Sequence, residues 1–89
     1  MNKCAIITIS GRVQGVGFRY FLLRQAQALD IKGLAKNISL GQVYVEAEGS
    51  QEMLELFIEQ CKQGPVRARV ESIEIQWCPE QGFSEFRIR

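Results

Sequence analysis

Histidine is absent from the 89 residues of this chain, and its absence excludes more chemistry than any other feature of the composition. Without an imidazole there is no histidine to act as a general base, to activate a nucleophile or to bind zinc. The three cysteines, Cys4, Cys61 and Cys78, form an odd set without CxxC spacing, which argues against a disulfide framework and fits a reducing compartment. Any reaction must therefore use other groups.

An excess of one charge and long apolar runs are also missing. Eleven Lys and Arg residues against ten Asp and Glu residues give a net charge of +1, too small for the broad positive field that attracts nucleic acid or anionic lipid. No apolar run approaches the ~18 residues of a membrane-spanning helix, and the first residues do not form a secretory signal. We therefore expect a cytoplasmic protein that binds neither nucleic acid nor membrane.

A chain of this length supports one hydrophobic core, because two cores would each fall below the size that normally folds unaided. We expect residues 1–89 to form a single domain and the protein to be a monomer.

The first half of the chain predicts a strand, a helix and a hairpin. Residues 3–10 are rich in β-branched side chains and stop at Gly11, which is typical of a strand. Apolar side chains in residues 18–29 recur at spacings of three and four, as on an amphipathic helix. Residues 33–39 and 42–48 flank a tight turn, and the second of them alternates in polarity, which predicts a β-hairpin.

The second half adds a helix and two strands. Ser50 suits the N-cap of a helix that a Gly-Pro pair ends. Apolar residues change parity within residues 67–77, which predicts a strand with a bulge near residues 71–72, and a last short strand covers about 83–88. This order predicts an α+β fold, the ferredoxin-like β-α-β-β-α-β sandwich. Two helices would cover one face of an antiparallel sheet, with a short extra C-terminal strand.

That element order brings two distant segments to one edge of the sheet. Right-handed crossovers make the first two strands parallel, with the third strand antiparallel between them. The loop of residues 11–17 follows the first strand, and Asn37 lies late in the second, roughly 10 Å away across two strand spacings. Arg19, in the first turn of the first helix, is long enough to bridge that gap.

Residues 11–19 have the character of an anion site. Their glycines can turn backbone N–H groups inward beside the positive end of a helix dipole. The segment matches neither GxxxxGK[ST] nor GxGxxG, where Tyr20 replaces the last glycine, so the binding of nucleoside triphosphates or dinucleotides is not supported. A glycine-rich turn without a ligand explains the spacing equally well.

Two side chains favour a ligand, although each also has an ordinary explanation. A cation such as Arg19 in the first turn opposes the helix dipole unless an anion lies between them, but it is also compatible with a solvated arginine whose stem covers apolar surface. Asn37 stands in a strand, where Asn is disfavoured, and its amide suits the orientation of a water molecule; an edge strand near a turn would also tolerate it. For Arg12, earlier in the turn, a surface role is the better interpretation.

Other polar residues indicate structural roles. Cys4 and Cys61 are expected to be core thiols, and Cys78 lies in an expected loop where a reactive thiol is conceivable. We interpret one acidic cluster as a solvated face rather than a metal site; it comprises Glu46, Glu48 and Glu52. Four aromatic residues fall on periodic faces and should be core: Phe18, Phe21, Phe57 and Phe86.

The chain resembles the acylphosphatase family over essentially its whole length, most clearly in three segments: Gly11-Arg-Val-Gln-Gly-Val-Gly-Phe-Arg19, Gly33-Leu-Ala-Lys-Asn37 and Phe86-Arg-Ile-Arg89. The resemblance implies a hydrolase that cleaves small-molecule acyl phosphates to carboxylate and inorganic phosphate without metal or cofactor. It implies that Arg19 binds the phosphate and that Asn37 positions the attacking water. The loop amides that complete the phosphate site would be those of Gly15, Val16, Gly17, Phe18 and Arg19. The chain departs from the family's pattern at Leu40, where Asp is common.

This reaction suits a chain without histidine. The leaving carboxylate has a pKa of about 4 and needs no proton to depart, and the loose transition state of phosphoryl transfer asks mainly for alignment and charge stabilisation. One alternative is a non-catalytic module that binds phosphate or an acyl phosphate. A second is RNA binding, since RNA recognition motifs share the element order, but the third strand offers only Tyr44 and lacks paired stacking aromatics.

Overall fold

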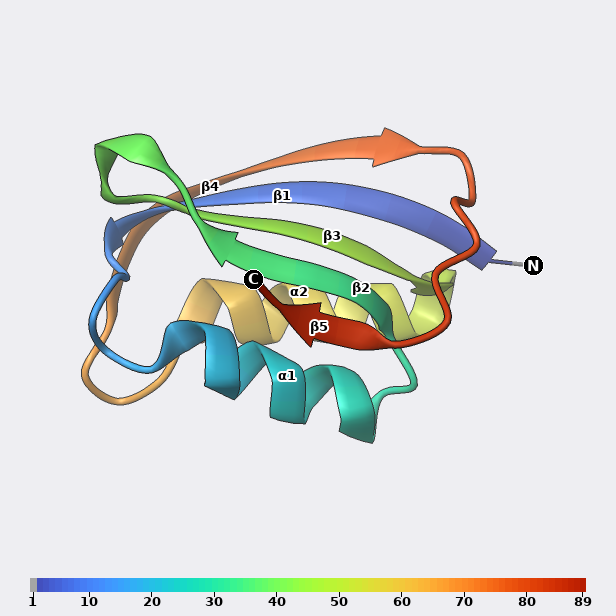
Figure 1. Ribbon diagram of the computed structural model, residues 1–89, viewed down its shortest axis with the longest axis horizontal. Coiled ribbons are helices and arrows are strands. Elements are labelled where there is room, and N and C mark those ends of the chain that lie inside the picture. The colour runs from blue at the N-terminus through green and yellow to red at the C-terminus, as the bar shows by residue number, and fades with distance from the viewer. Residues whose placement is uncertain (1) are drawn as a thin grey trace.

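The computed structural model describes residues 2–89, and its elements follow the predicted order (Figure 1). They are β1 (Asn2–Arg12), α1 (Phe18–Ala28), β2 (Lys32–Asn37), the 3-10 turn η1 (Ser39–Gly41), β3 (Val43–Ser50), α2 (Gln51–Gln63), β4 (Arg69–Cys78) and β5 (Phe86–Ile88). Neither helix has both the length and the apolar character that crossing a membrane requires, within the residues described.

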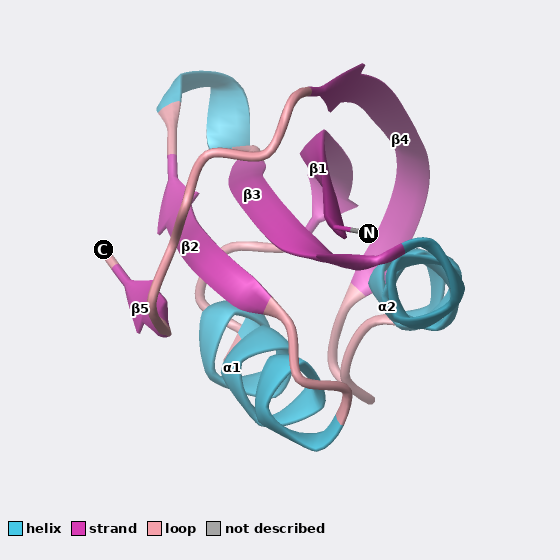
Figure 2. Ribbon diagram, turned by 90° about the vertical axis from the view of Figure 1, so that its right-hand side faces the viewer, coloured by secondary structure: helices cyan, strands magenta, loops and turns pink. Residues whose placement is uncertain are grey.

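The five strands form one sheet in the order β4-β1-β3-β2-β5. Strand β3 lies antiparallel between β1 and β2, so β1 and β2 run in the same direction, as the crossover rule predicts. Both helices cover one face of this sheet (Figure 2). The ferredoxin-like architecture predicted from the sequence is thereby confirmed.

The sheet is mixed rather than antiparallel, which corrects one expectation. Strand β5 pairs with β2 in parallel, with Leu34 opposite Arg87. The reason is the connection after β4, which crosses from one edge of the sheet to the other and so brings β5 down beside β2 in the same direction (Figure 2). Strand β5 also starts at Phe86, later than expected, because the N–H groups of residues 81–83 bond to a side chain instead of to a strand.

Strand β1 does not stop at Gly11 but continues to Arg12. Its partner β4 carries the predicted bulge: Ser10 lies opposite Ser72, whereas Gly11 lies opposite Val70, so one residue of β4 is left over. Pairing resumes beyond the bulge and extends β1 by two residues. The glycine-rich loop therefore begins later than the sequence pattern indicates.

The hydrophobic core lies between the sheet and the two helices. Strand residues such as Ile7 and Val45 are fully buried there, and the Ser50 Oγ accepts a hydrogen bond from the Met53 N–H at 3.2 Å, which confirms the predicted N-cap of α2. Three of the four predicted core phenylalanines are buried, namely Phe18, Phe57 and Phe86. Phe21 is only partly buried and packs against the edge of the core.

Glu48 is the clearest departure from the expected solvated acidic face. It is only 2% exposed, and its carboxylate accepts hydrogen bonds from the N–H groups of Gln81, Gly82 and Phe83 at 2.6 to 3.1 Å. Three successive amides around one oxyanion form a nest, an arrangement that favours negative charge. Glu48 therefore anchors the connection that leads to β5.

Cys78 is the last residue of β4 rather than part of a loop. It lies directly opposite Cys4 of β1, and both are free thiols. Burial, followed by a hydrogen bond with the Cys78 thiol, raises the pKa of Cys4 to about 12. Burial alone raises the pKa of Cys61 well above its usual value. Cys4 and Cys61 are core thiols, as expected.

Candidate active site

A cavity of about 200 Å³ lies where the C-terminal ends of β1 and β2 meet the start of α1. Its lining residues are Val13, Gly15, Gly17, Phe18, Arg19, Tyr20 and Asn37. Arg19 and Asn37, which are 18 positions apart in the sequence, thus share one cavity with the glycine loop (residues 11–17). The topology produces this juxtaposition because β1 and β2 are parallel and only one strand apart.

The glycine loop owes its shape to two residues in the left-handed region. Gly15 has φ 74° and Gly17 has φ 78°, and Gly17 is the N-cap residue of α1. An ideal Cβ at either position would meet no other atom within 4 Å, so glycine is required by the backbone conformation and not by crowding. The loop can therefore turn sharply into the helix while its N–H groups stay open on one side.

The amides of this loop have no acceptor within the part of the chain that the structure describes. For the N–H groups of Gly15 to Arg19, no hydrogen bond to the protein is formed, and Gly17 supplies no side-chain cap. The Phe21 N–H, which donates to the Gly17 carbonyl at 3.0 Å, opens the helical pattern. Free N–H groups at the positive end of a helix dipole are the standard protein environment for an anion.

Arg19 is held in place by the end of the chain's last strand. Its Nη1 donates to the main-chain oxygen of Arg89 at 2.8 Å, and the Arg89 N–H in turn donates to the carbonyl of Ala35 in β2 at 2.8 Å. No Asp or Glu side chain among residues 2–89 forms an ion pair with its guanidinium, and the first turn of α1 contains no acidic residue. Arg19 is therefore oriented by a main-chain oxygen and has no acidic side chain as a partner.

Asn37 is the last residue of β2, where it pairs with Val43 of β3. Its side chain is exposed at the cavity and forms no hydrogen bond with the residues described. Both the oxygen and the nitrogen of its amide are thus free to bind a water molecule.

Gln14 has a structural role that the sequence did not reveal. Its Nε2 donates to the Ile38 carbonyl at 2.8 Å and to the Gln42 carbonyl at 2.9 Å, which ties the glycine loop to the turn that follows Asn37. A further bond, from Gln42 Nε2 to Ser10 Oγ at 2.9 Å, joins the same turn to β1. No spacing rule could have found Gln14, because its acceptors are main-chain atoms 24 and 28 residues away.

Of the expected phosphate-binding residues, only Val16 does not line the cavity. It faces a neighbouring hollow of about 360 Å³, together with Arg12, Gln14, Gly15 and Arg67. Its backbone N–H still belongs to the unpartnered series of the loop.

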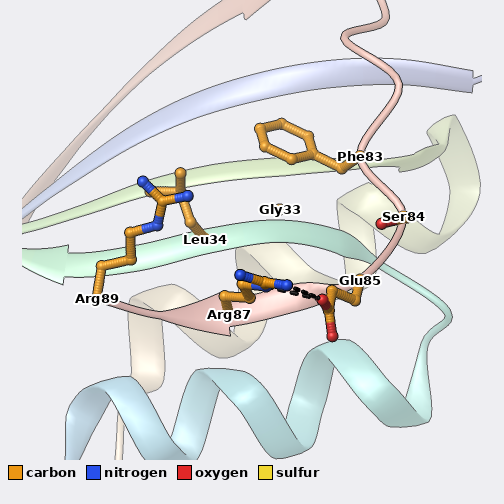
Figure 3. Close-up of a pocket in the computed structure, with 7 residues that line it drawn as sticks. All are labelled: Gly33, Leu34, Phe83, Ser84, Glu85, Arg87 and Arg89. Atoms are coloured by element: carbon orange, nitrogen blue, oxygen red, sulfur yellow. Dashed lines mark hydrogen bonds and ion pairs between the residues drawn. The ribbon is translucent and has the colours of Figure 1, made fainter.

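Another hollow, of about 110 Å³, lies on the face of the sheet that the helices leave open (Figure 3). It is bounded by β2, β5 and the connection before β5, and Arg87 there is already paired with Glu85, with Nη2 and Oε2 2.6 Å apart. It offers no helix N-terminus and no series of free amides. Across residues 2–89, no three acidic or cysteine side chains are gathered in a way that could hold a metal ion.

The structure is a small α/β sandwich with a cavity, lined by the glycine loop, Arg19 and Asn37, at one edge of its sheet. The family model for acylphosphatase matches residues 5–88. An acylphosphatase from Thermus thermophilus is 47% identical over 83 residues, which cover 93% of this chain and 94% of that protein. The chain belongs to the acylphosphatase family.

Solved structures agree with this assignment. An acylphosphatase from Coxiella burnetii superposes with a TM-score of 0.95 at 33% identity, covering 99% of this chain and 93% of that one. An acylphosphatase from Bacillus subtilis gives a TM-score of 0.93 at 37% identity, covering 100% and 99% of the two chains.

Proposed function

We propose that this protein is an acylphosphatase that hydrolyses the carboxyl-phosphate bond of acyl phosphates, releasing a carboxylate and inorganic phosphate. One observation carries the proposal: unpartnered loop amides, an arginine without an acidic partner and a free asparagine amide border the same small cavity. Membership in the acylphosphatase family supports the same reaction.

The phosphoryl group would be bound by the amides of Gly15 to Arg19 and by the guanidinium of Arg19. One Nη of Arg19 is occupied by the Arg89 oxygen, which leaves its other N–H groups for phosphate oxygens. Charge-assisted bonds of this kind are shorter and roughly twice as strong as neutral ones. They also strengthen as charge spreads over the equatorial oxygens in the transition state, which is how preorganised donors accelerate a reaction.

The water molecule would be positioned by Asn37. The amide oxygen of Asn37 would accept a hydrogen bond from the water, which directs a lone pair of the water oxygen toward phosphorus. The water oxygen forms the new bond to phosphorus, the bond from phosphorus to the carboxyl oxygen breaks, and its electron pair leaves with the carboxylate. The proton lost by the water passes to an oxygen of the phosphate, so no side-chain base is needed. Because the carboxylate is a weak base, no acid is needed either.

Purified protein incubated with benzoyl phosphate tests this proposal. We expect loss of the anhydride at the same rate with and without a chelator, and competitive inhibition by inorganic phosphate. A non-catalytic binding module would bind phosphate but leave benzoyl phosphate to decay at its uncatalysed rate. Turnover that the chelator abolishes would contradict the metal-independent mechanism.

We also propose that residues 1–89 act as a single monomeric domain in the cytoplasm, without nucleic acid or membrane partners. The net charge of +1 and the three free thiols support this. Sedimentation at micromolar concentration should give one species with the 10.1 kDa mass of the chain.

A further inference from the structure

Three arginines lie beside the glycine loop without an acidic partner. Arg12 and Arg67 line the same hollow, and Arg12 lies directly opposite Arg69 in the pairing of β1 with β4. Among residues 2–89, ion pairs are formed by Lys32, Lys62 and Arg87 and by none of these three. Like charges directly opposite each other in a sheet are destabilising. The repulsion between Arg12 and Arg69 therefore destabilises the fold, and no ion pair among residues 2–89 offsets it.

The hollow beside these arginines adjoins the candidate active site. Its volume is about 360 Å³, and Gly15 lines both this hollow and the cavity that contains Arg19 and Asn37. At Gly15 an ideal Cβ would meet no atom within 4 Å. A ligand bound in the cavity can thus extend past this glycine toward Arg12 and Arg67.

The geometry of phosphoryl transfer fixes the direction of the acyl group relative to the attacking water. The attacking and leaving oxygens lie roughly in line through phosphorus, so the leaving carboxyl group points away from the water. Asn37, which would hold the water, lines only the first cavity, whereas Arg12 and Arg67 line only the second. In this geometry the acyl group extends away from Asn37, and the hollow lined by Arg12 and Arg67 adjoins the cavity at Gly15.

We propose that Arg12 and Arg67 form a second anion subsite, which selects acyl phosphates whose acyl group carries another negative group, a carboxylate or a phosphate. The inference rests on the proposed function and specifies its substrate class. Guanidinium groups match both kinds of oxyanion through two parallel N–H bonds, and an anion bound by Arg12 also offsets the repulsion between Arg12 and Arg69.

The test compares benzoyl phosphate with its 3- and 4-carboxybenzoyl and 4-phosphonobenzoyl analogues, all assayed as hydrolysis by the intact chain. Comparison of the phosphonate with the carboxylates distinguishes the two kinds of anion. Comparison of the 3- and 4-carboxybenzoyl isomers probes the position of the charged group. We expect kcat/KM to be higher for at least one charged analogue than for benzoyl phosphate. The preference should weaken as salt increases, because both arginines are exposed.

Substitution of the two arginines tests whether they are the source of the preference for charged substrates. Arg12→Gln and Arg67→Gln should each lower the charged-to-neutral ratio of kcat/KM by roughly two- to fivefold, and the double variant by about tenfold, as for exposed ion pairs. Arg24→Gln is the matched control, because it removes the same charge from an exposed position on α1. Its ratio should equal that of the unmodified protein. Without ligand, Arg12→Gln should also raise the melting temperature, since it removes the repulsion from Arg69.

Two results would overturn the subsite while leaving the proposed function intact: benzoyl phosphate hydrolysed as well as every charged analogue, or an unchanged ratio in the double variant. An equal fall of the ratio in Arg24→Gln would also overturn it, because the preference would then come from overall charge. Failure to hydrolyse benzoyl phosphate at all would instead overturn the proposed function.

Discussion

A cluster of backbone N–H groups lies at each end of this sheet, and only one of the two clusters has an acceptor within the described protein. At one end, the amides of residues 81–83 surround the carboxylate of Glu48, so donors and acceptor both belong to the chain. At the other end, the amides of Gly15 to Arg19 and the guanidinium of Arg19 face a cavity, and no protein acceptor among residues 2–89 satisfies these amides. Figure 1 shows the two segments at opposite ends of the molecule.

The difference indicates what each cluster of amides does. A nest that contains its own anion stabilises the fold, because a buried carboxylate with several N–H donors is already satisfied. For the amides of Gly15 to Arg19 we propose binding of an anionic ligand, because donors at a helix N-terminus favour negative charge. The predictions below test this contrast, from the largest expected effect to the smallest.

Arg19→Ala tests the end of the sheet where the amides face the cavity, and we expect it to have the largest effect. Removal of one preorganised donor at comparable sites lowers kcat by about 10² to 10³, and a guanidinium that makes two charged bonds should matter at least as much. We expect kcat/KM for benzoyl phosphate and inhibition by inorganic phosphate to be lost together. Arg24→Ala, on the exposed face of α1, is the control and should retain both. Undiminished phosphate inhibition in Arg19→Ala would place the phosphate elsewhere.

Asn37→Ala separates water positioning from phosphate binding. We expect turnover of benzoyl phosphate to fall by about 10², because the water loses its orienting hydrogen bond. The inhibition constant of inorganic phosphate should change little, since the amides and Arg19 remain. A rate close to that of the unmodified protein would assign the water to another group.

Glu48→Gln tests the other end of the sheet, where the amides of residues 81–83 bind a carboxylate of the protein. The amide of Gln would direct a donor at N–H groups that are donors themselves, so we expect the free energy of unfolding to fall by about 1 to 3 kcal/mol. Urea unfolding measures this change. Glu80→Gln is the control, because it removes a charge from an exposed position in the same connection. Its stability should be unaltered, and equal losses in both variants would mean that net charge, not the nest, is responsible.

Leu40→Asn should give the smallest effect and the opposite sign. Leu40 has φ 66° and is 92% exposed, so it has a left-handed backbone conformation without compensating burial. Asn tolerates this conformation far better than a bulky residue, and we expect a gain of about 1 kcal/mol in the free energy of unfolding. Leu56→Asn, at a partly exposed helical position, should give no gain. A loss in Leu40→Asn would show that Leu40 contributes contacts in solution that offset its strain.

Much of the fold could be predicted from the sequence because its elements have clear periodicity. The strand with a bulge near residues 71–72, the cap at Ser50 and the parallel direction of β1 and β2 all followed from local patterns and general topology. The parallel placement of β5 could not be predicted in this way. Its three residues carry too short a pattern, and its direction depends on the path of the connection that Glu48 anchors.

The residues of the candidate site, like the elements of the fold, were only partly predictable from the sequence. Arg19 and Asn37 could be proposed because one is a cation at a helix start and the other is an amide in a strand. Gln14 and Glu48 were missed or misread, since each bonds to main-chain groups 24 to 35 residues away. Arg12 is exposed, as expected, but its register opposite Arg69 and its position beside Arg67 could not be predicted from local spacing.

The sequence by itself determined the order of helices and strands and the glycine loop that precedes α1, because periodicity and glycine conformation act between near neighbours in the chain. Only the tertiary structure decided which amides keep an anion of their own and which face a cavity. That distinction depends on main-chain donors and acceptors brought together from distant segments, and such groups are the same in every residue and leave no mark in the sequence.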